Sequence, residues 1–566
     1  MTLSSNNDLG VVASGIDVKG LKAAIAVYEG GGSPEQIEHI ETHISHVFLT
    51  KAFAYKLKKS VRFDFLDFST FERRRQACEK EVELNKRTAP DVYLGVVDIC
   101  RTPDGRLILG GDEGVVDSVV KMRRLPSTLM MDEKIAINDV READISALID
   151  VLDKFYRETK RIHPDPATFV NSLRNEILAN FVELGRDVHC LDQDLLRRIR
   201  NRQLQFLELN SDLWVARIKS GLIVDGHGDL RPEHICLEDI PKIFDCVEFN
   251  DGFRQVDLLD EICFFALECE RLGRRDIGTT LLQSKLTDYR LGHNSDLADF
   301  FMSYRATVRA KVAVLRMEQT AGDDQRRALI LAKRYLDLAD RGMGPMSRPF
   351  CVIVRGLVGS GKSTVSKRLS ERLGMTLIQS DRVRREQNIR SEAGEAYGEG
   401  VYSLSGRLHI YEKMLETAVS ALRNRTSVIL DACYLQKDVQ QRVLYQVDAL
   451  GVELVIINCE CPQEVAVSRV LERMKDPSCL SDARPEHWLD QARDDEGMIS
   501  GAHVLNIRTS SSGPDQLCDQ IIAYLRSLAM NLDPSSSRVG SGSYWDTSAE
   551  VRRSFDTSRL ATLARV

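Results

Sequence analysis

The sequence lacks several features that would place it in a special class of protein. No apolar run approaches the roughly 20 residues that a membrane helix needs, and the N-terminus has no basic segment followed by an apolar stretch. The 13 cysteines are odd in number and scattered, and no Cys-x2-Cys pair is present, which disfavours a disulfide framework and a zinc site. We therefore expect reduced thiols in a cytoplasmic protein with no membrane partner.

The chain also lacks an excess of positive charge, because its 77 Lys and Arg residues are outnumbered by 84 Asp and Glu residues, and the formal net charge is −7 at pH 7. This balance disfavours nucleic acid as a main partner, although a local basic pocket can still bind a small anion. The apolar content of 43% and the charged content of 28% are ordinary for a globular protein. A chain of 566 residues is too long for one core, so we expect about three or four domains.

What the sequence does contain is a phosphate-binding loop pattern, Gly-x4-Gly-Lys-Ser, at residues 356–363. An apolar run at 351–354 predicts a buried strand before it, and 364–373 predicts a helix after it. Such a loop surrounds phosphate with backbone N–H groups at a helix N-terminus, while Lys362 reaches the β- and γ-phosphates and Ser363 holds Mg²⁺. The expected ATP-binding residues are Gly356, Leu357, Val358, Gly359, Ser360, Gly361, Lys362, Ser363 and Thr364.

Beyond this loop, predicted strands and helices alternate along the chain. Alternation of this kind predicts a parallel α/β sheet with helices on both faces. Ligands of such sheets bind at the carboxyl ends of the strands. The predicted strands are 351–354, 376–378, 427–430 and 453–458, with 503–507 as a candidate fifth.

Two acids fall at the carboxyl ends of these strands: Asp381 follows the second strand and Asp431 ends the third. These positions resemble small P-loop kinases of the gluconate kinase, polynucleotide kinase and zeta toxin type. The resemblance implies that Asp381 faces the acceptor hydroxyl and that Asp431 lies beside the metal. Arg384 or Arg385 could hold an acidic or hydroxylated substrate. Acids with a purely structural role are the alternative.

Arg469 and Arg473 are four residues apart on a predicted helix at 463–474, so they share one face. In kinases of this type an arginine of the lid closes over the transferring phosphate. The resemblance therefore implies a catalytic role for both arginines and a lid loop at 475–485. The alternative is a surface helix with ordinary arginines.

The N-terminal half follows a different plan, in which strands surround one helix. A strand at 53–58 contains Lys56, and the helix contains Glu81, with Glu79 as the alternative partner. A strand lysine with a helix glutamate is typical of a kinase N-lobe. The predicted strands are 40–50, 53–58, 92–100, 106–109 and 115–122, with the helix at 69–89.

The segment at 226–234 reads Gly-His-Gly-Asp-Leu-Arg-Pro-Glu-His, and Asp245 ends an apolar strand soon after it. This half resembles aminoglycoside and choline phosphotransferases. The resemblance implies that Asp229 orients the acceptor hydroxyl and takes its proton, and that Asp245 holds Mg²⁺. It also implies that Lys56 binds the α- and β-phosphates and that Glu81 orients Lys56. The second metal position is His234, where the family has Asn.

The order of the two halves resembles a bacterial two-module family, in which an aminoglycoside phosphotransferase-like domain is fused to an ATPase or gluconate kinase-like domain. We therefore expect a bilobal, protein-kinase-like α+β domain followed by a P-loop domain with a parallel α/β sheet. The expected divisions are an N-terminal extension (1–35), the kinase-like domain (36–342, with lobes 36–125 and 126–342), the P-loop domain (343–530) and a disordered tail (531–566).

The expected function is an ATP- and Mg²⁺-dependent kinase whose acceptor is the hydroxyl group of a small metabolite, such as a sugar or amino sugar. The alternative is an ATP-binding regulatory protein in which one module is a degenerate kinase. Aminoglycoside resistance is disfavoured, because nothing indicates an acidic pocket for a polycationic drug and Arg231 lies beside Asp229. The acidic balance of the chain disfavours a polynucleotide kinase.

Overall fold

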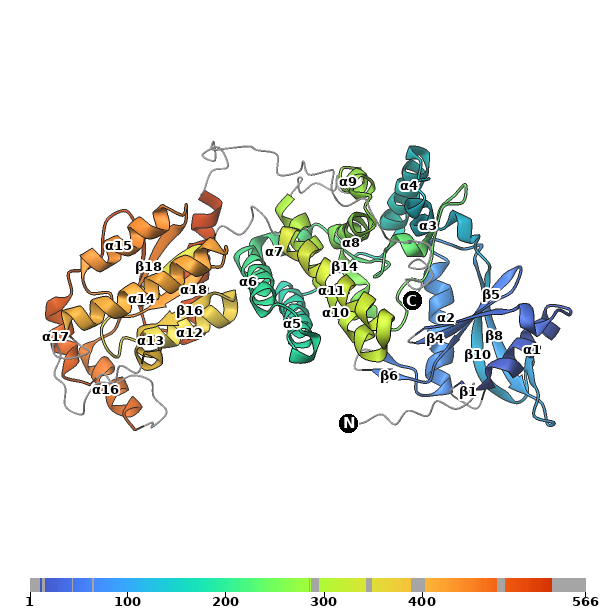
Figure 1. The fold of residues 1–566 in the computed structure, drawn as a ribbon, viewed down its shortest axis with the longest axis horizontal. Helices are drawn as coiled ribbons and strands as arrows, with labels where there is room; N and C mark the ends of the chain where they lie inside the picture. The colour runs from blue at the N-terminus through green and yellow to red at the C-terminus, as the bar shows by residue number, and fades with distance from the viewer. Residues whose placement is uncertain are drawn as a thin grey trace. The chain divides into compact units, whose positions relative to one another are not determined.

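The computed structural model describes residues 11–12, 16–42, 44–63, 66–284, 286, 295–342, 349–387, 403–475 and 484–531. The chain forms two compact units with separate cores (Figure 1). The first unit contains the described residues up to 164 together with Ala216–Arg305, and the second contains Asp165–Val215 together with the described residues from 306 onward. This division into compact units differs from the predicted domain boundary at residue 342. That boundary stays a prediction.

The first unit is built on an antiparallel sheet with the strand order β3-β4-β5-β10-β8-β9. Successive side chains of a strand point to opposite faces, so Tyr55 and Leu57 pack with helix α1 (Val18–Tyr28), whereas Ala54 packs with helix α2 (Phe71–Asn85). Even-numbered side chains of β5 therefore face α2. The strands are β3 (Glu38–Glu41), β4 (Ser45–Leu49), β5 (Phe53–Lys58), β8 (Tyr93–Arg101), β9 (Leu107–Leu109) and β10 (Val115–Arg123), with the short pairs β1 (Val11–Val12) with β2 (Ile16–Asp17) and β6 (Arg62–Phe63) with β7 (Leu66–Asp67).

The structure differs from two predictions for this region. The segment predicted as an N-terminal extension (1–35) contains helix α1. The Asp17 carboxylate accepts a hydrogen bond from the N–H of Gly20 and caps this helix, and Leu21 and Ile25 are fully buried against the sheet. The strand predicted at 40–50 is interrupted, because β3 ends and β4 begins around a turn at Thr42.

The remainder of the first unit supports the loop at 226–234. β11 (Ile223–Asp225) pairs with β14 (Gln255–Asp257) and leads directly into this loop. The buried carboxylate of Glu261 accepts a hydrogen bond from the N–H of Gly228 and another from the hydroxyl of Tyr156, the latter at 2.8 Å. Glu261 thus anchors the loop to the core of the unit. The other elements are α3 (Met131–Ala136), α4 (Glu142–Glu158), β12 (Ile235–Cys236), β13 (Lys242–Ile243), α8 (Leu258–Arg271) and α9 (Arg275–Leu282).

The second unit contains a parallel sheet with the order β16-β17-β15-β18-β19. Helices α14 and α15 pack on one face, and α12 and α18 on the other (Figure 1). Both predicted fold classes are therefore confirmed, and the candidate fifth strand is part of the sheet. The elements are β15 (Phe350–Arg355), α12 (Lys362–Leu373), β16 (Thr376–Gln379), α13 (Ser380–Glu386), α14 (Leu404–Arg423), β17 (Val428–Asp431), α15 (Lys437–Asp448), β18 (Glu453–Glu460), α16 (Gln463–Arg473), α17 (His487–Asp494), β19 (His503–Arg508) and α18 (Pro514–Asn531).

Helix α6 (Gln193–Leu209) precedes this sheet by a long stretch of sequence but packs against α12 and α18. Leu209 is 8% exposed and belongs to the same apolar core as Leu373 and Leu525. The Ser427 hydroxyl donates to Gln205 Oε1 at 2.8 Å. The core of the phosphate-binding half is thus completed by α6. The remaining helices are α5 (Pro166–Leu184), α7 (Ser211–Lys219), α10 (Ser295–Gln319) and α11 (Gly322–Gly342).

None of the helices in the described parts of the chain is both long and apolar enough to span a bilayer.

We predict that Leu209→Ala lowers the free energy of unfolding of the second unit by about 2–5 kcal/mol, the usual cost of emptying a buried leucine site. Urea denaturation followed by circular dichroism measures this loss. Leu178→Ala on α5 is the matched control, because Leu178 is 38% exposed, and its effect should stay within about 1 kcal/mol. Equal effects of the two substitutions would show that α6 does not complete this core.

Candidate functional site

The phosphate-binding loop joins the central strand β15 to helix α12. Gly359 has φ +75°, and a Cβ at this position would lie 2.3 Å from the carbonyl oxygen of Ala466, so the loop requires glycine there. Gly361 is the N-cap of α12 and provides no side-chain hydrogen bond. The N–H groups of the first helical turn therefore remain for a ligand, and a phosphate is the ligand that a helix N-terminus favours.

Lys362 is the first residue of α12, and its Nζ donates to the carbonyl oxygen of Leu357 at 3.3 Å. Burial lowers the pKa of Lys362, but the neighbouring Cys433, Asp431 and Asp381 outweigh burial and raise it overall. The side chain is therefore a cation at neutral pH. A phosphate oxygen can replace the long hydrogen bond to Leu357 at little cost.

A pocket at the carboxyl ends of β15, β16 and β17 brings Lys362, Ser363, Asp381, Asp431 and Arg473 together. These residues come from distant parts of the sequence and from four different elements. The carboxyl edge of a parallel sheet is where such side chains are expected to converge. The structure thus places the predicted lysine, both predicted acids and one of the predicted arginines around a single space.

Asp431 lines this pocket and is 3% exposed. Its Oδ2 accepts a hydrogen bond from Gln379 Nε2 at 2.8 Å, whereas its Oδ1 has no partner among the residues that the structure describes. Burial raises the pKa of Asp431. A buried carboxylate oxygen without a partner, beside the hydroxyl of Ser363, forms the hard oxygen donor set that Mg²⁺ prefers. The residues present therefore fit Mg²⁺.

The two arginines of α16 have different surroundings. Arg473 lines the pocket, and its buried Nη2 lacks a hydrogen-bond partner within the described ranges. Arg469 instead donates from Nη1 to Thr509 Oγ1 at 2.9 Å and from Nη2 to the Thr509 carbonyl oxygen at 2.8 Å. Thr509 therefore holds the guanidinium of Arg469 beside the loop, and Arg469 is not among the lining residues. Its role over the transferring phosphate stays a prediction.

Of the other predicted loop residues, Val358 also lines the pocket, and several make contacts that fix the backbone of the loop. The N–H of Val358 donates to Gln491 Oε1 at 2.8 Å, and the carbonyl oxygen of Ser360 accepts from the Thr509 hydroxyl at 2.6 Å. A Cβ on Gly356 would lie 2.5 Å from the carbonyl oxygen of Cys459. Thr364 is exposed on α12 and is not among the lining residues. Residues 476–483 of the predicted lid lie outside the described residues.

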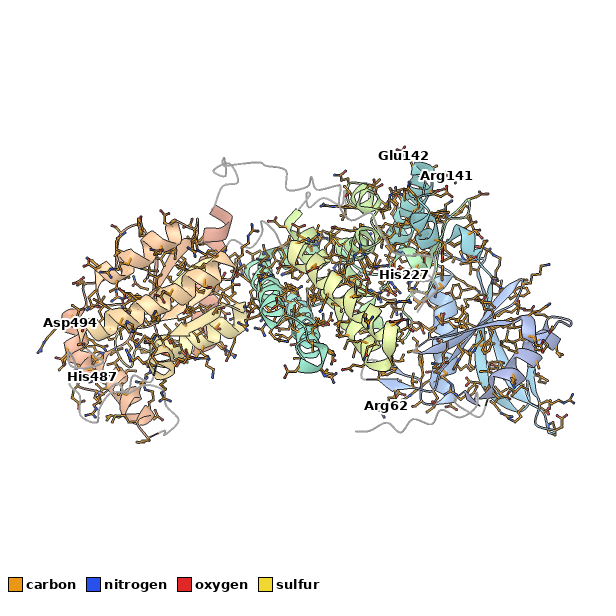
Figure 2. All side chains as sticks on the ribbon, in the orientation of Figure 1. Arg62, Arg141, Glu142, His227, His487 and Asp494 are labelled. Carbon is orange, nitrogen blue, oxygen red and sulfur yellow. The ribbon has the colours of Figure 1, made fainter. Side chains whose placement is uncertain are left out.

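The pocket also contains residues that the sequence analysis did not single out. Arg407 and Tyr411 on α14 are four residues apart, a spacing that places them on one face of a helix. Gln491 comes from α17, whose two ends are marked by His487 and Asp494 in Figure 2. The four-residue spacing of Arg407 and Tyr411 indicates that they share a face of α14. Only the tertiary fold shows that this face lines the pocket. The other unpredicted lining residues are Gln379, Ser380 and Cys433.

In the first unit, Lys56, Glu81 and Asp245 meet. Lys56 Nζ lies 3.0 Å from Glu81 Oε1 and 2.6 Å from Asp245 Oδ1. Glu79 is exposed and pairs with Arg75, so of the two candidate glutamates it is Glu81 that contacts the lysine. Burial raises the pKa of Asp245, but the charge of Lys56 outweighs it and holds this pKa well below its usual range.

A second lysine, Lys58, was missed and is more deeply buried than Lys56. Its Nζ donates to Glu81 Oε2 at 2.7 Å and also to Glu248 Oε1. The two oxygens of Glu81 are therefore divided between the two lysines. Burial raises the pKa of Glu248, whereas for Glu81 the charges of Lys56 and Lys58 outweigh burial and lower the pKa. This network ties β5, α2 and the segment after Asp245 together.

The loop at 226–234, marked by His227 in Figure 2, is internally bonded. Arg231 Nη2 donates to Asp229 Oδ2 at 2.8 Å and to His234 Nε2 at 3.0 Å. With Nε2 accepting, His234 Nδ1 donates to the carbonyl oxygen of Asp229 at 3.0 Å. The Nε2 lone pair is thus engaged by Arg231, although Asp245 Oδ2 is only 3.5 Å away. The metal-ligand role of His234 stays a prediction.

Comparisons with known proteins find a relative that spans most of the chain and others that match part of it. The family described as "AAA domain" matches residues 351–495. The uncharacterized protein Rv2004c of Mycobacterium tuberculosis is 32% identical over 445 residues, which cover 76% of this chain and 85% of the relative. A shikimate kinase of Corynebacterium efficiens is 25% identical over 180 residues, which cover 32% of this chain and 98% of that protein. A solved structure of mutant aminoglycoside 2'-phosphotransferase IIIa with GDP is 15% identical, covers 58% of this chain and 99% of its own, and has a TM-score of 0.35.

We predict that Glu81→Ala destabilises the first unit by about 3–5 kcal/mol, because it leaves two buried lysines without a shared carboxylate. Chemical denaturation measures the change. Glu79→Ala on the same helix is the control and should stay within about 0.5 kcal/mol, since Glu79 forms an exposed pair. A loss below about 1 kcal/mol for Glu81→Ala would contradict the network described above.

A second prediction concerns Asp431. The pKa of Asp431 is raised, so its carboxyl group loses its proton at a higher pH in the folded protein than in the unfolded chain. As the pH rises above the ordinary pKa of an Asp carboxyl group, this difference lowers the free energy of unfolding. Asp431→Asn removes this effect. At pH 7 we expect a melting temperature equal to or above that of the wild type without ligand, together with loss of the Mg²⁺-dependent gain in ATP affinity. Thermal shift with and without Mg²⁺ and ATP tests both expectations. A lower melting temperature, or a retained Mg²⁺ effect, would count against them.

Proposed function

We propose that this chain, which belongs to the same two-module family as the mycobacterial protein Rv2004c, is an ATP-dependent kinase of a small hydroxylated metabolite such as a sugar or amino sugar. The observation that carries this proposal is the pocket of the second unit, in which Lys362, Asp381 and Asp431 face one space. The likeness to a shikimate kinase over this half supports it, because that protein is named as a kinase.

The lining residues suit phosphoryl transfer. Lys362 and the N–H groups at the start of α12 would hold the terminal phosphates of ATP. Asp381 would accept the proton of the acceptor hydroxyl. The hydroxyl oxygen would form a bond to the γ-phosphorus, while the bond between that phosphorus and the β,γ-bridging oxygen breaks and ADP is released. Arg473 would stabilise the charge on the transferring group. Mg²⁺ held by Ser363 and Asp431 would supply further neutralisation of the phosphate oxygens.

A different observation favours a regulatory role for the first unit. Asp229 is bonded to Arg231, and Arg231 also engages His234, so the proposed base and the second metal position are held by groups of the protein itself. Lys56 and Asp245 remain suited to ATP and one metal ion. We propose as the second candidate that the first unit binds ATP with little turnover. Aminoglycoside phosphorylation is disfavoured in the first unit by Arg231, whose charge would repel a polycation beside Asp229.

The kinase proposal predicts that Lys362→Ala lowers phosphoryl transfer by roughly a hundredfold or more, since one preorganised charge donor is commonly worth that factor. Transfer is measured with radiolabelled ATP and a metabolite extract. Lys367→Ala is the matched control, because Lys367 is an exposed residue of the same helix. It should leave transfer unchanged.

Asp229→Asn completes this experiment and should leave most of the transfer intact. Loss of transfer in Asp229→Asn with normal transfer in Lys362→Ala would assign catalysis to the first unit. If neither substitution changes transfer, or if the wild type labels no acceptor while binding ATP, the kinase proposal is wrong.

A further inference from the structure

We propose that Tyr93 and Asn85 are positioning residues of the first unit, which turn the carboxylate of Asp245 toward Lys56 and a metal ion. This inference rests on the second candidate function, ATP binding by the first unit. It concerns two residues that act through the backbone beside Asp245. Neither residue belongs to the motifs on which that function was proposed.

The backbone of Asp245 has an unusual conformation. Its φ is +62°, in the left-handed region that residues other than glycine rarely adopt. Such a conformation persists only where the surrounding structure fixes it, and it is found most often at functional sites. In this conformation Asp245 Oδ1 lies 2.6 Å from Lys56 Nζ. The groups that fix the backbone therefore also fix the direction of the carboxylate.

Two buried side chains bind the consecutive N–H groups at this position. The hydroxyl oxygen of Tyr93 accepts a hydrogen bond from the N–H of Asp245 at 3.1 Å. Asn85 Oδ1 accepts a hydrogen bond from the N–H of Cys246 at 2.9 Å. The two bonds hold the peptide groups before and after the Cα of Asp245, so they fix both of its backbone torsion angles. Tyr93 is 1% exposed and Asn85 is fully buried, so packing immobilises both side chains.

The connection from α2 to β8 contains both residues and is bound to the same site. Asn85 is the last residue of α2, and Tyr93 is the first residue of β8. Between them, the Thr88 hydroxyl donates to the carbonyl oxygen of Ile243 at 2.6 Å. Asn85 Nδ2 also donates to the carbonyl oxygen of Glu81 at 2.8 Å. One continuous stretch of chain thus carries the glutamate that contacts the strand lysine and the two groups that hold the acid.

The carboxylate of Asp245 remains open to a metal ion. Its side chain is 38% exposed, and its Oδ2 lies 3.5 Å from His234 Nε2, which exceeds ordinary hydrogen-bond length. A carboxylate oxygen is the hard ligand that Mg²⁺ and Mn²⁺ prefer, so this residue fits either ion. Groups that orient a metal ligand are typically worth ten- to a hundredfold in metal affinity. Tyr93 and Asn85 stand in that relation to Asp245.

Mn²⁺ binding to the full-length protein tests the proposal. The second unit is disabled by Lys362→Ala with Asp431→Asn. Mn²⁺ is then titrated in the presence of a non-hydrolysable ATP analogue, and the free ion is measured by electron paramagnetic resonance. Tyr93→Phe should weaken Mn²⁺ binding roughly ten- to a hundredfold, because it removes the acceptor for the N–H of Asp245. The affinity for the analogue without a divalent ion should not change, since this hydroxyl holds the metal ligand.

A second variant and two controls accompany this measurement. Asn85→Leu removes the other hydrogen bond with little change in side-chain volume, and it should have a similar effect. Tyr28→Phe is the matched control, because Tyr28 lies on α1 and is 38% exposed. Val82→Ala is the control for lost stability, since it shortens a buried side chain of α2 and removes no side-chain hydrogen bond. Neither control should change the affinity for Mn²⁺.

The possible outcomes separate this inference from the function on which it rests. An unchanged Mn²⁺ affinity in Tyr93→Phe would overturn the inference and leave ATP binding by the first unit standing. An equal loss in Val82→Ala would overturn it as well, because the hydroxyl would then act through stability alone. If the protein with the second unit disabled binds neither the ATP analogue nor Mn²⁺, the proposed ATP binding by the first unit is wrong, and this inference fails with it.

Discussion

The geometry of the phosphate site depends on how helix α12 is held at both of its ends. In the loop before its N-terminus, two glycines lie so close to the carbonyl oxygens of Ala466 and Cys459 that a Cβ would not fit. They are Gly359 and Gly356. At its C-terminus a Cβ on Gly374 would lie 2.9 Å from Cα of Asn201, on helix α6. Because close-packed interiors transmit displacements, α12 and its first residue Lys362 can move only if these neighbours move. The close packing at the two ends of α12 therefore positions the anion site.

The two candidate sites differ in how their buried charges are satisfied. In the second unit, Asp431 Oδ1 and Arg473 Nη2 are buried without hydrogen-bond partners in the described part of the chain, and an unsatisfied buried polar atom is costly. A ligand in the pocket would remove that cost. In the first unit, Arg231 bonds to Asp229 and Lys56 bonds to Asp245, so the chain itself compensates these charges. Because Asp381 of the second unit is likewise paired with Arg384, the proposal for that unit depends on Asp431 and Arg473.

Much of the fold could be predicted from local pattern. Continuous apolar runs and alternating helices identified all five strands of the parallel sheet, and a strand lysine with a helix glutamate indicated the contact between Lys56 and Glu81. Helix α1 was missed because its stability comes from burial of Leu21 and Ile25 against a sheet that forms later in the sequence. The deep burial of Lys58 was missed for a similar reason, since the residue alternates with Leu57 and looks like a solvent-exposed lysine until α2 covers it.

The amino-acid sequence alone determined the phosphate loop, because its chemistry depends on neighbouring glycines, one lysine and one serine in a continuous stretch. It also determined the acids at the strand ends, since the carboxyl edge of a parallel sheet follows from strand order along the chain. Only the tertiary structure decided that Arg473 and Arg407 line the pocket while Arg469 is bound by Thr509. Those outcomes depend on which distant side chains converge after packing, and no local pattern of residues encodes that convergence.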